Sequence, residues 1–186
     1  MVRRFKPQPG VDAPPNPKSR WCVRGHQDPD SESLEVYAPT PQSESVMSVL
    51  QCVSSMGWQL HIADCKNAFC QSNQLVRERG NIFVEPCDGL GLDKGQLIQL
   101  VAPVYGLNDA PILWHQTLTG WLADQGFVKS LLEPCLWFRR SKLGSLESLV
   151  LIEVDDLIIA GENKSIQSFK QAITQRFRFG KWETSH

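Results

Sequence analysis

The residues with the clearest potential for chemistry are the adjacent aspartates Asp155 and Asp156. Apolar, β-forming residues flank them at 149–152 and at 157–160, a pattern that predicts a strand, a tight turn and a second strand. Two interpretations are open. Aspartate is a common turn residue, so the pair is compatible with a solvated hairpin tip. Two carboxylates held near a core also repel each other and lose hydration, and a hard divalent cation such as Mg²⁺ relieves both penalties.

Composition sets the outer limits on fold and function. The chain has 186 residues, 41% of them hydrophobic and 21% charged, which suits one domain or one large subdomain with a real core. The net charge of −1 gives no bulk basicity, so any contact with nucleic acid requires a local basic patch. No window reaches the length of a membrane span, and the first 20 residues contain no apolar signal core.

The cysteines indicate a reducing compartment. They are scattered, with no Cys-x-x-Cys pair and no Cys/His spacing suited to zinc. This distribution is typical of reduced, mostly buried thiols in an intracellular protein, either cytoplasmic or nuclear. The six positions are Cys22, Cys52, Cys65, Cys70, Cys87 and Cys135.

The N-terminal end has a different composition from the remainder. Residues 1–19 carry five of the twelve prolines and few large apolar residues, so we expect an extended or disordered leader, with its boundary after residue 17. Residues 21–23 (WCV) are expected to form a short strand, and residues 25–33 are polar and rich in turn formers.

Helical periodicity occurs in three stretches, near residues 43–56, 110–125 and 163–177. Pro41 is expected in the first turn of the first helix and Gly57 at its end, while Pro111 and Gly126 mark the second helix in the same way. The expected N-caps are Thr40 or Ser43, Asn108 or Asp109, and Asn163.

The strands predicted between these helices complete an α+β fold. They cover residues 58–64, a hairpin at 81–86 and 96–101, residues 135–138, and the hairpin around the aspartate pair. We therefore expect a mostly antiparallel sheet with helices on one face. Asp64 ends the first of these strands, where an aspartate is usually a turn or cap residue. If that strand neighbours the hairpin, three carboxylates can meet and bind two Mg²⁺ ions, which is an arrangement for in-line displacement at phosphorus.

Six short segments, in the same order along the chain, resemble the reverse transcriptase domain of copia-type LTR retrotransposons. Residues 18–25 (KSRWCVRG) are similar to the family's Lys-Ala-Arg-Leu-Val-Ala-(Lys/Arg)-Gly block, and residues 37–39 (YAP) to its Phe-Ala-Pro-Val segment. Residues 64–69 (DCKNAF) resemble Asp-Val-Lys-Thr-Ala-Phe, residues 104–114 (VYGLNDAPILW) resemble Ile-Tyr-Gly-Leu-Lys-Gln-Ala-Pro-Arg-x-Trp, residues 126–130 (GFVKS) resemble Gly-Phe-x-x-Ser, and residues 153–156 (EVDD) stand where the family has Tyr-Val-Asp-Asp. Six ordered matches are highly specific, because each motif occurs in its expected context.

The resemblance implies a right-hand polymerase palm with part of the fingers over residues 18–180, followed by a tail at 181–186. It implies an RNA-directed DNA polymerase that acts on an RNA or DNA template with a primer and deoxynucleoside triphosphates. No membrane partner is expected. The sequence does not give the oligomeric state. The site residues implied are Asp64 and Asp155 for two Mg²⁺ ions (or Mn²⁺ in their place), Asp156 in support, Phe69 beneath the nucleotide's sugar, Lys18 and Arg20 at its triphosphate, and Tyr105, Gly106 and Leu107 around the pocket.

The sequence departs from the family pattern near the aspartate pair. Glu153 replaces an aromatic residue, and strand alternation predicts that Glu153 and Asp155 share a face, where a charge would disturb primer packing or metal binding. The family's Lys, Gln and Arg are replaced by Asn108, Asp109 and Ile112, which removes two positive charges and adds a negative one beside the nucleic acid. Glu133 stands where the family usually has Asp.

These departures support a second hypothesis. From its length we expect the chain to lack a thumb and the family's protease, integrase and ribonuclease H regions. The alternative is therefore a truncated, catalytically inactive retroelement relic with at most weak binding of nucleic acid.

Overall fold

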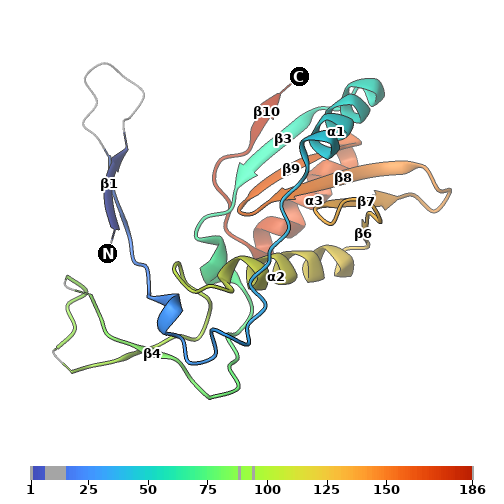
Figure 1. Cartoon of the computed structure of the whole chain (residues 1–186). Helices are drawn as coiled ribbons and strands as arrows, with labels where there is room; N and C mark the ends of the chain where they lie inside the picture. Colours follow the sequence, from blue (N-terminus) through green and yellow to red (C-terminus); the bar gives the residue numbers. More distant parts are fainter. Residues whose placement is uncertain (1, 7–15, 88, 94, 186) are drawn as a thin grey trace.

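The computed structural model describes residues 2–6, 16–87, 89–93 and 95–185, and its centre is a six-stranded sheet in the order β10-β3-β9-β8-β7-β6 (Figure 1). Every strand pairing in this described part is antiparallel. The expected α+β class with an antiparallel sheet is therefore confirmed. The strands of the central sheet are β3 (Leu60–Asp64), β6 (Val128–Lys129), β7 (Leu136–Arg140), β8 (Leu146–Glu153), β9 (Asp156–Gly161) and β10 (Glu183–Ser185).

Two helices, α2 (Ala110–Asp124) and α3 (Asn163–Arg176), cover one face of this sheet. Their apolar residues pack on alternate residues of β8 and β9 and bury a large aromatic core. The members of this core include Trp114, Leu118 and Leu122 of α2, Ile166, Phe169 and Ile173 of α3, and Val150, Ile152, Leu157 and Ile159 of the two strands.

The third helix, α1 (Ser43–Met56), packs on the opposite face, so the expectation that the helices share one face was wrong (Figure 1). Val49 and Val53 of α1 contact Leu149 and Ala160. Leu149 and Val150 are neighbours in β8 and therefore point to opposite sides of the sheet. The unbroken apolar run at 149–152 is the signature of a strand that is buried on both faces.

A tertiary contact replaces the expected local cap of α1. The N-cap is Gln42, which makes no side-chain cap bond, and Pro41 precedes the helix. The Gln42 N–H donates instead to the Glu133 carboxylate at 3.1 Å. Burial opposes ionisation of Glu133, but hydrogen bonds from Cys135, Gln42 and Ser45 outweigh it and lower its pKa. The other two helices begin after Asp109, as predicted, and after Glu162, one residue earlier than predicted, while Gly57 ends α1 in the left-handed conformation as predicted.

The N-terminal part is arranged outside the central sheet. Strand β1 (Val2–Lys6) pairs with β2 (Asn16–Arg20), where an extended or disordered leader was expected, and residues 7–15 lie outside the described part. Residues 21–23 do not form the predicted strand. Further along are the short helices η1 (Gly25–Gln27) and η2 (Ala68–Gln71), and the predicted hairpin, which is reduced to β4 (Phe83–Val84) and β5 (Ile98–Gln99).

The remaining expectations concern cysteines and membranes. All six cysteines are free thiols; Cys65 and Cys135 are buried, and the other four are at least partly exposed. Within the described residues, no helix combines the length and the apolar character needed to cross a bilayer.

A buried ion network joins the N-terminal segment to the start of α2. The Arg77 guanidinium contacts the carboxylates of Asp28 at 3.0 Å and Asp109 at 2.8 Å, and all three side chains are at least 96% buried. Asp109 is thus an internal ion-pair partner and does not add a charge to an exposed nucleic-acid surface. A second pair, Arg79 with Asp30 at 3.2 Å, has an exposed guanidinium.

We expect Arg77→Met to destabilise the protein by about 3–5 kcal/mol, because it leaves two buried carboxylates without their partner. Arg79→Met is the matched control and is expected to cost about 1 kcal/mol or less, since the Arg79 guanidinium is exposed and the buried Asp30 keeps the Arg79 backbone N–H as a partner. Urea denaturation of the two variants provides the comparison. Equal losses in both would show that the buried network does not stabilise the fold.

A buried histidine fastens the C-terminal strand to the sheet. His61 of β3 lies with its Nδ1 2.9 Å from the Thr184 hydroxyl of β10 and 3.0 Å from Lys170 Nζ of α3. Burial and the Lys170 charge lower the His61 pKa, because both disfavour the imidazolium form. A neutral Nδ1 accepts a hydrogen bond, whereas a protonated one does not.

The contribution of neutral His61 to the free energy of unfolding is therefore expected to be fully present above about pH 6.5, the pKa of a histidine in the unfolded chain. This contribution falls as the pH drops from about 6.5 through the lowered pKa of His61 in the folded protein. His61→Asn keeps an acceptor and cannot titrate in this range, so its stability should change less than wild type between pH 7.5 and 5.5 in urea denaturation. The pKa of His115 is also lowered, by burial and by Lys129. A separate His115 variant measures the contribution of His115 to the pH dependence, so that this contribution can be subtracted. Parallel curves for wild type and His61→Asn would contradict this assignment.

Candidate active site

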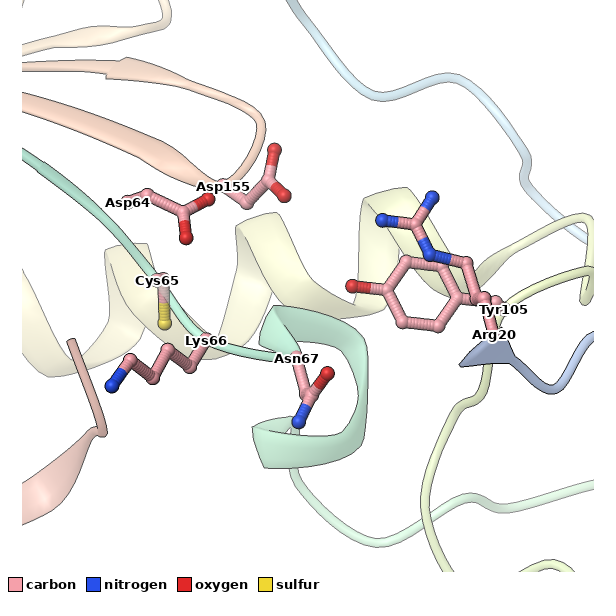
Figure 2. A pocket seen from close by; sticks show the side chains of 7 residues that line it. All are labelled: Arg20, Asp64, Cys65, Lys66, Asn67, Tyr105 and Asp155. Carbon is pink, nitrogen blue, oxygen red and sulfur yellow. The ribbon is translucent and has the colours of Figure 1, made fainter. Parts of the chain in front are cut away.

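Asp64 and Asp155 approach each other at one end of the central sheet (Figure 2). Asp64 ends β3, and the pairing of β3 with β9 places it opposite Asp156, next to the turn. The backbone N–H of Cys65 donates to the Asp155 carbonyl at 2.7 Å, which ties the end of β3 to that turn. In Figure 2 the Asp64 carboxylate points toward Asp155, whose own carboxylate points away from Asp64, toward the side of Arg20 and Tyr105. The pairing of β3 with β9 confirms the predicted meeting of Asp64 with the aspartate pair at one end of the sheet.

The two aspartates line a pocket of about 340 Å³. It contains an Arg20 guanidinium and the Tyr105 ring on the side away from β3 (Figure 2). The lining is completed by Cys65, Lys66 and Asn67, which follow Asp64 directly in the chain.

The predicted tight turn between β8 and β9 is present and consists of Val154 and Asp155, one residue earlier than the aspartate pair at which the sequence placed it. Val154 has a φ of 53°, and Asn67 is the other non-glycine residue with positive φ in the described part. A positive φ at the first of the two central residues alone matches a type II′ turn, in which glycine is usual at that position. A β-branched residue there is strained by about 1–3 kcal/mol.

Asp156 and Glu153 face each other across the hairpin, in a way that alternation did not predict. Glu153 ends β8, so regular alternation stops there, and the register pairs Glu153 with Asp156. Directly opposed residues share a face of the sheet, so Glu153 lies beside Asp156, and the expectation that it shares a face with Asp155 was wrong. Asp156 in turn pairs with Asp64, which gives three opposed carboxylates on three adjacent strands.

The charges at this end of the sheet act on one another. The Asp156 pKa is raised by burial and by the negative charges of Asp155, Asp64 and Glu153. Asp156 does not line the pocket, and in the described part no three His, Cys, Asp or Glu side chains form a cluster able to hold a metal ion. The geometry therefore offers a cation the carboxylates of Asp64 and Asp155 in one pocket, inside a wider negative field.

Three residues singled out in the sequence pack against one another at the pocket. The Arg20 guanidinium lies over the Tyr105 ring, 4.3 Å from its centroid, and the Tyr105 ring lies 4.9 Å from that of Phe69. Burial raises the Tyr105 pKa, which keeps its hydroxyl protonated at neutral pH. The Lys18 side chain lies outside the described part.

Gly106 allows two backbone segments to approach each other closely. A Cβ at this position would lie 2.1 Å from the Val23 carbonyl oxygen, and its φ of 96° also favours glycine. The Val23 N–H donates to the Tyr105 carbonyl and the Gly25 N–H to that of Gly106, each at 2.9 Å. Gly106 does not line the pocket; it allows the segment after Arg20 to run beside Tyr105. Leu107 is buried in a neighbouring apolar cluster.

Sequence patterns assigned no functional role to the three pocket residues that follow Asp64. The Cys65 thiol is buried, and burial with the charges of Asp64 and Asp155 raises its pKa to about 12, so it stays protonated. Lys66 and Asn67 also line the pocket, and the Lys66 ammonium end points away from Arg20 and Tyr105 in Figure 2. Their position directly after a strand-ending aspartate was the signal available in the sequence.

Comparisons with known proteins identify the family. The family described as "Reverse transcriptase (RNA-dependent DNA polymerase)" matches residues 11–184. The chain is 26% identical over 152 residues to the "Retrovirus-related Pol polyprotein from transposon TNT 1-94" of Nicotiana tabacum, covering 80% of this chain and 11% of that protein. It is 23% identical over 158 residues to the "Transposon Ty1-NL2 Gag-Pol polyprotein" of Saccharomyces cerevisiae, covering 84% and 8% respectively.

A third relative, the "Putative transposon Ty5-1 protein YCL074W" of Saccharomyces cerevisiae, is 31% identical over 80 residues, which cover 42% of this chain and 25% of that protein. The chain thus spans between about a tenth and a quarter of the length of these relatives. No solved structure matches it. The ordered motifs, the paired aspartates and the family match over nearly the whole chain lead to one assignment: the chain belongs to the reverse transcriptase family of copia-type retrotransposons.

Proposed function

We propose that this chain is the palm, with part of the fingers, of an RNA-directed DNA polymerase. The observation that carries the proposal is the convergence of Asp64 and Asp155 in one pocket with the Arg20 guanidinium. Two carboxylates bind divalent cations, and a fixed cation elsewhere in the same pocket complements the phosphates of a nucleotide. The family implies a nucleic-acid template and nucleotide substrates in general.

Reverse transcriptases generally use divalent metal ions. The residues present fit such an ion, because the field that raises the Asp156 pKa is an excess of negative charge that a cation neutralises. Asp64 and Asp155 would hold Mg²⁺, or Mn²⁺ in its place, with Asp156 in support. When bound, the ions activate the attacking hydroxyl and stabilise charge on the leaving phosphates.

The other pocket residues bind and orient the nucleotide in this proposal. Arg20, held over the Tyr105 ring, contacts the triphosphate, and Lys18 of the same strand assists it. Phe69 supports Tyr105 and presents its ring beneath the sugar, where it excludes a ribonucleotide's 2′-hydroxyl. Gly106 keeps the Arg20 segment beside Tyr105.

One observation favours the alternative, a reverse transcriptase domain without activity. Glu153 lies opposite Asp156 and adds a carboxylate where the family pattern has an aromatic ring. A third negative strand residue strengthens the repulsion around the metal ligands and removes an apolar surface from the same face.

Primer extension distinguishes the two. With an oligo(dT) primer on poly(A), dTTP and Mg²⁺, we expect wild type to extend the primer and Asp155→Asn to lose about 100-fold or more, the scale for losing one electrostatic group in a preorganised site. Glu153→Tyr tests the alternative in the same assay. A silent wild type with an active Glu153→Tyr locates the defect at this residue, and silence of all three folded proteins favours the inactive domain.

Metal binding is also expected to appear as a stability effect. Asp155→Asn removes one of several repelling carboxylates, so the metal-free variant should be as stable as wild type or more so. Mg²⁺ at about ten times its Kd should raise the unfolding free energy of wild type by about 1.4 kcal/mol and leave Asp155→Asn unchanged. Thermal unfolding with EDTA and with Mg²⁺ measures both. A large loss of metal-free stability in the variant would indicate a structural role for Asp155.

Glu153→Gln should stabilise the metal-free protein by about 0.5 kcal/mol or less at pH 7, because it removes a like charge opposite Asp156 at an exposed position. Glu183→Gln is the matched control: Glu183 is also an exposed strand residue, but it pairs with the apolar Ile62. Urea denaturation in EDTA gives the comparison. An unchanged or lower stability of Glu153→Gln, relative to this control, would contradict the repulsion inferred here.

A further inference from the structure

The turn that carries Asp155 has a conformation that its own sequence disfavours. Val154 adopts a φ of 53°, and the residues on either side of it, Glu153 and Asp155, bring two negative charges to the same short segment. An isolated hairpin of this sequence would avoid this conformation, because β-branched residues rarely adopt positive φ. Contacts from outside the hairpin must therefore hold the turn.

One of these contacts comes from helix α2. The indole Nε1–H of Trp114 donates to the Val154 carbonyl at 2.7 Å. Trp114 is 1% exposed and packs edge-on against Phe177, with ring centroids 5.2 Å apart. The surrounding core thus fixes the direction of the indole N–H, and no bulk water reaches it to replace the lost partner if the turn moves.

The second contact comes from the chain after β3. The Cys65 N–H donates to the Asp155 carbonyl at 2.7 Å. The two successive carbonyls of the turn, those of Val154 and Asp155, are therefore bound from different elements. A change at the Val154 peptide displaces the Asp155 backbone relative to Asp64, because the two bonded carbonyls belong to adjacent peptide units that are joined at the Asp155 Cα.

We propose that Trp114 is a positioning residue for the polymerase site: its indole N–H holds the strained Val154 peptide and thereby keeps Asp155 in its place beside Asp64 in the pocket. The consequence for catalysis rests on the proposed function, whereas the structural part is testable in the metal-free protein. A displacement of about 1 Å in a catalytic constellation lowers the rate about 100-fold.

The first test is local and needs no metal. Trp114→Phe keeps an aromatic ring against Phe177 and removes the N–H. We expect the Cys65 amide, the reporter of the bond to the Asp155 carbonyl, to exchange its hydrogen about tenfold faster or more under native conditions. Trp137→Phe is the matched control, because Trp137 is a buried core indole whose Nε1–H has no acceptor among the described residues. Its Cys65 exchange should stay within about twofold of wild type, after correction for global stability.

The second test is a rescue. Glycine adopts positive φ without strain, so Val154→Gly removes the need for the indole bond. In the Trp114→Phe background, Val154→Gly should return Cys65 exchange to within about threefold of wild type. A Trp114 that acted only through core packing would not be rescued by a change in the turn.

The third readout connects the turn to the site. In titrations with Mn²⁺ alone, Trp114→Phe should bind about tenfold more weakly, with recovery in the double variant. In primer extension, kcat should fall while the KM for dTTP changes by less than about threefold.

The outcomes separate the two proposals. Unchanged Cys65 exchange in Trp114→Phe, or no recovery with Val154→Gly, overturns the positioning role. Faster exchange in a protein whose wild type binds no Mn²⁺ supports the positioning role and overturns the proposed function. If Trp114→Phe does not fold, 3-benzothienylalanine is placed at position 114, where it replaces the N–H by sulfur at constant shape. Faster Cys65 exchange then supports the positioning role, and unchanged exchange overturns it.

Discussion

The structure depends on holding two carboxylates together against their repulsion. Like charges at neighbouring positions repel each other, and the repulsion grows as burial lowers the local dielectric. Asp64 and Asp155 are kept in this arrangement by the pairing of β3 with β9 and by the bond from the Cys65 N–H to the Asp155 carbonyl. The sheet thus stores negative charge in a fixed geometry, which is the condition for preorganised binding of a cation.

Burial on both faces gives the sheet the rigidity that this requires. The core under α2 and α3 and the smaller core under α1 close on β8 and β9 from opposite sides. Close-packed interiors resist displacement, so the ends of these strands have little freedom to separate. The Arg77 network extends this order to the N-terminal segment, since it joins residues near Asp28 to the first residue before α2.

Two residues that depart from the family pattern have different roles in the structure. Asp109 is buried against Arg77 and is therefore part of the scaffold that positions the start of α2. Glu153 lies opposite Asp156 and joins the row of carboxylates beside the pocket. From the sequence alone, both substitutions look like a loss of charge complementarity to nucleic acid. The contacts in the structure show that Asp109 stabilises the scaffold, whereas Glu153 adds to the negative electrostatic field at the pocket.

Local patterns determined much of this protein. The apolar runs around the aspartate pair predicted the β8–β9 hairpin, helical periodicity predicted α1, α2 and α3, and Asp64 was correctly placed at the end of a strand. These features depend on residues within a few positions of one another, so they can be inferred from the sequence. The motif order added the family, which the comparison over residues 11–184 confirms.

Only the tertiary structure decided which distant residues meet. Strand β10 and the pairing of β1 with β2 depend on partners far along the chain or on weak local signals. The cap of α1 is a carboxylate 91 residues away, from Glu133, and no local pattern encodes it. Alternation predicted the wrong neighbour for Glu153 because register across a two-residue turn, and not parity along the chain, sets which carboxylates face each other. The hydrogen bond from the Trp114 indole to the Val154 carbonyl joins a helix residue to a turn 40 residues later. The sequence alone predicts that Trp114 is a core residue, and only the fold shows that its N–H binds the turn.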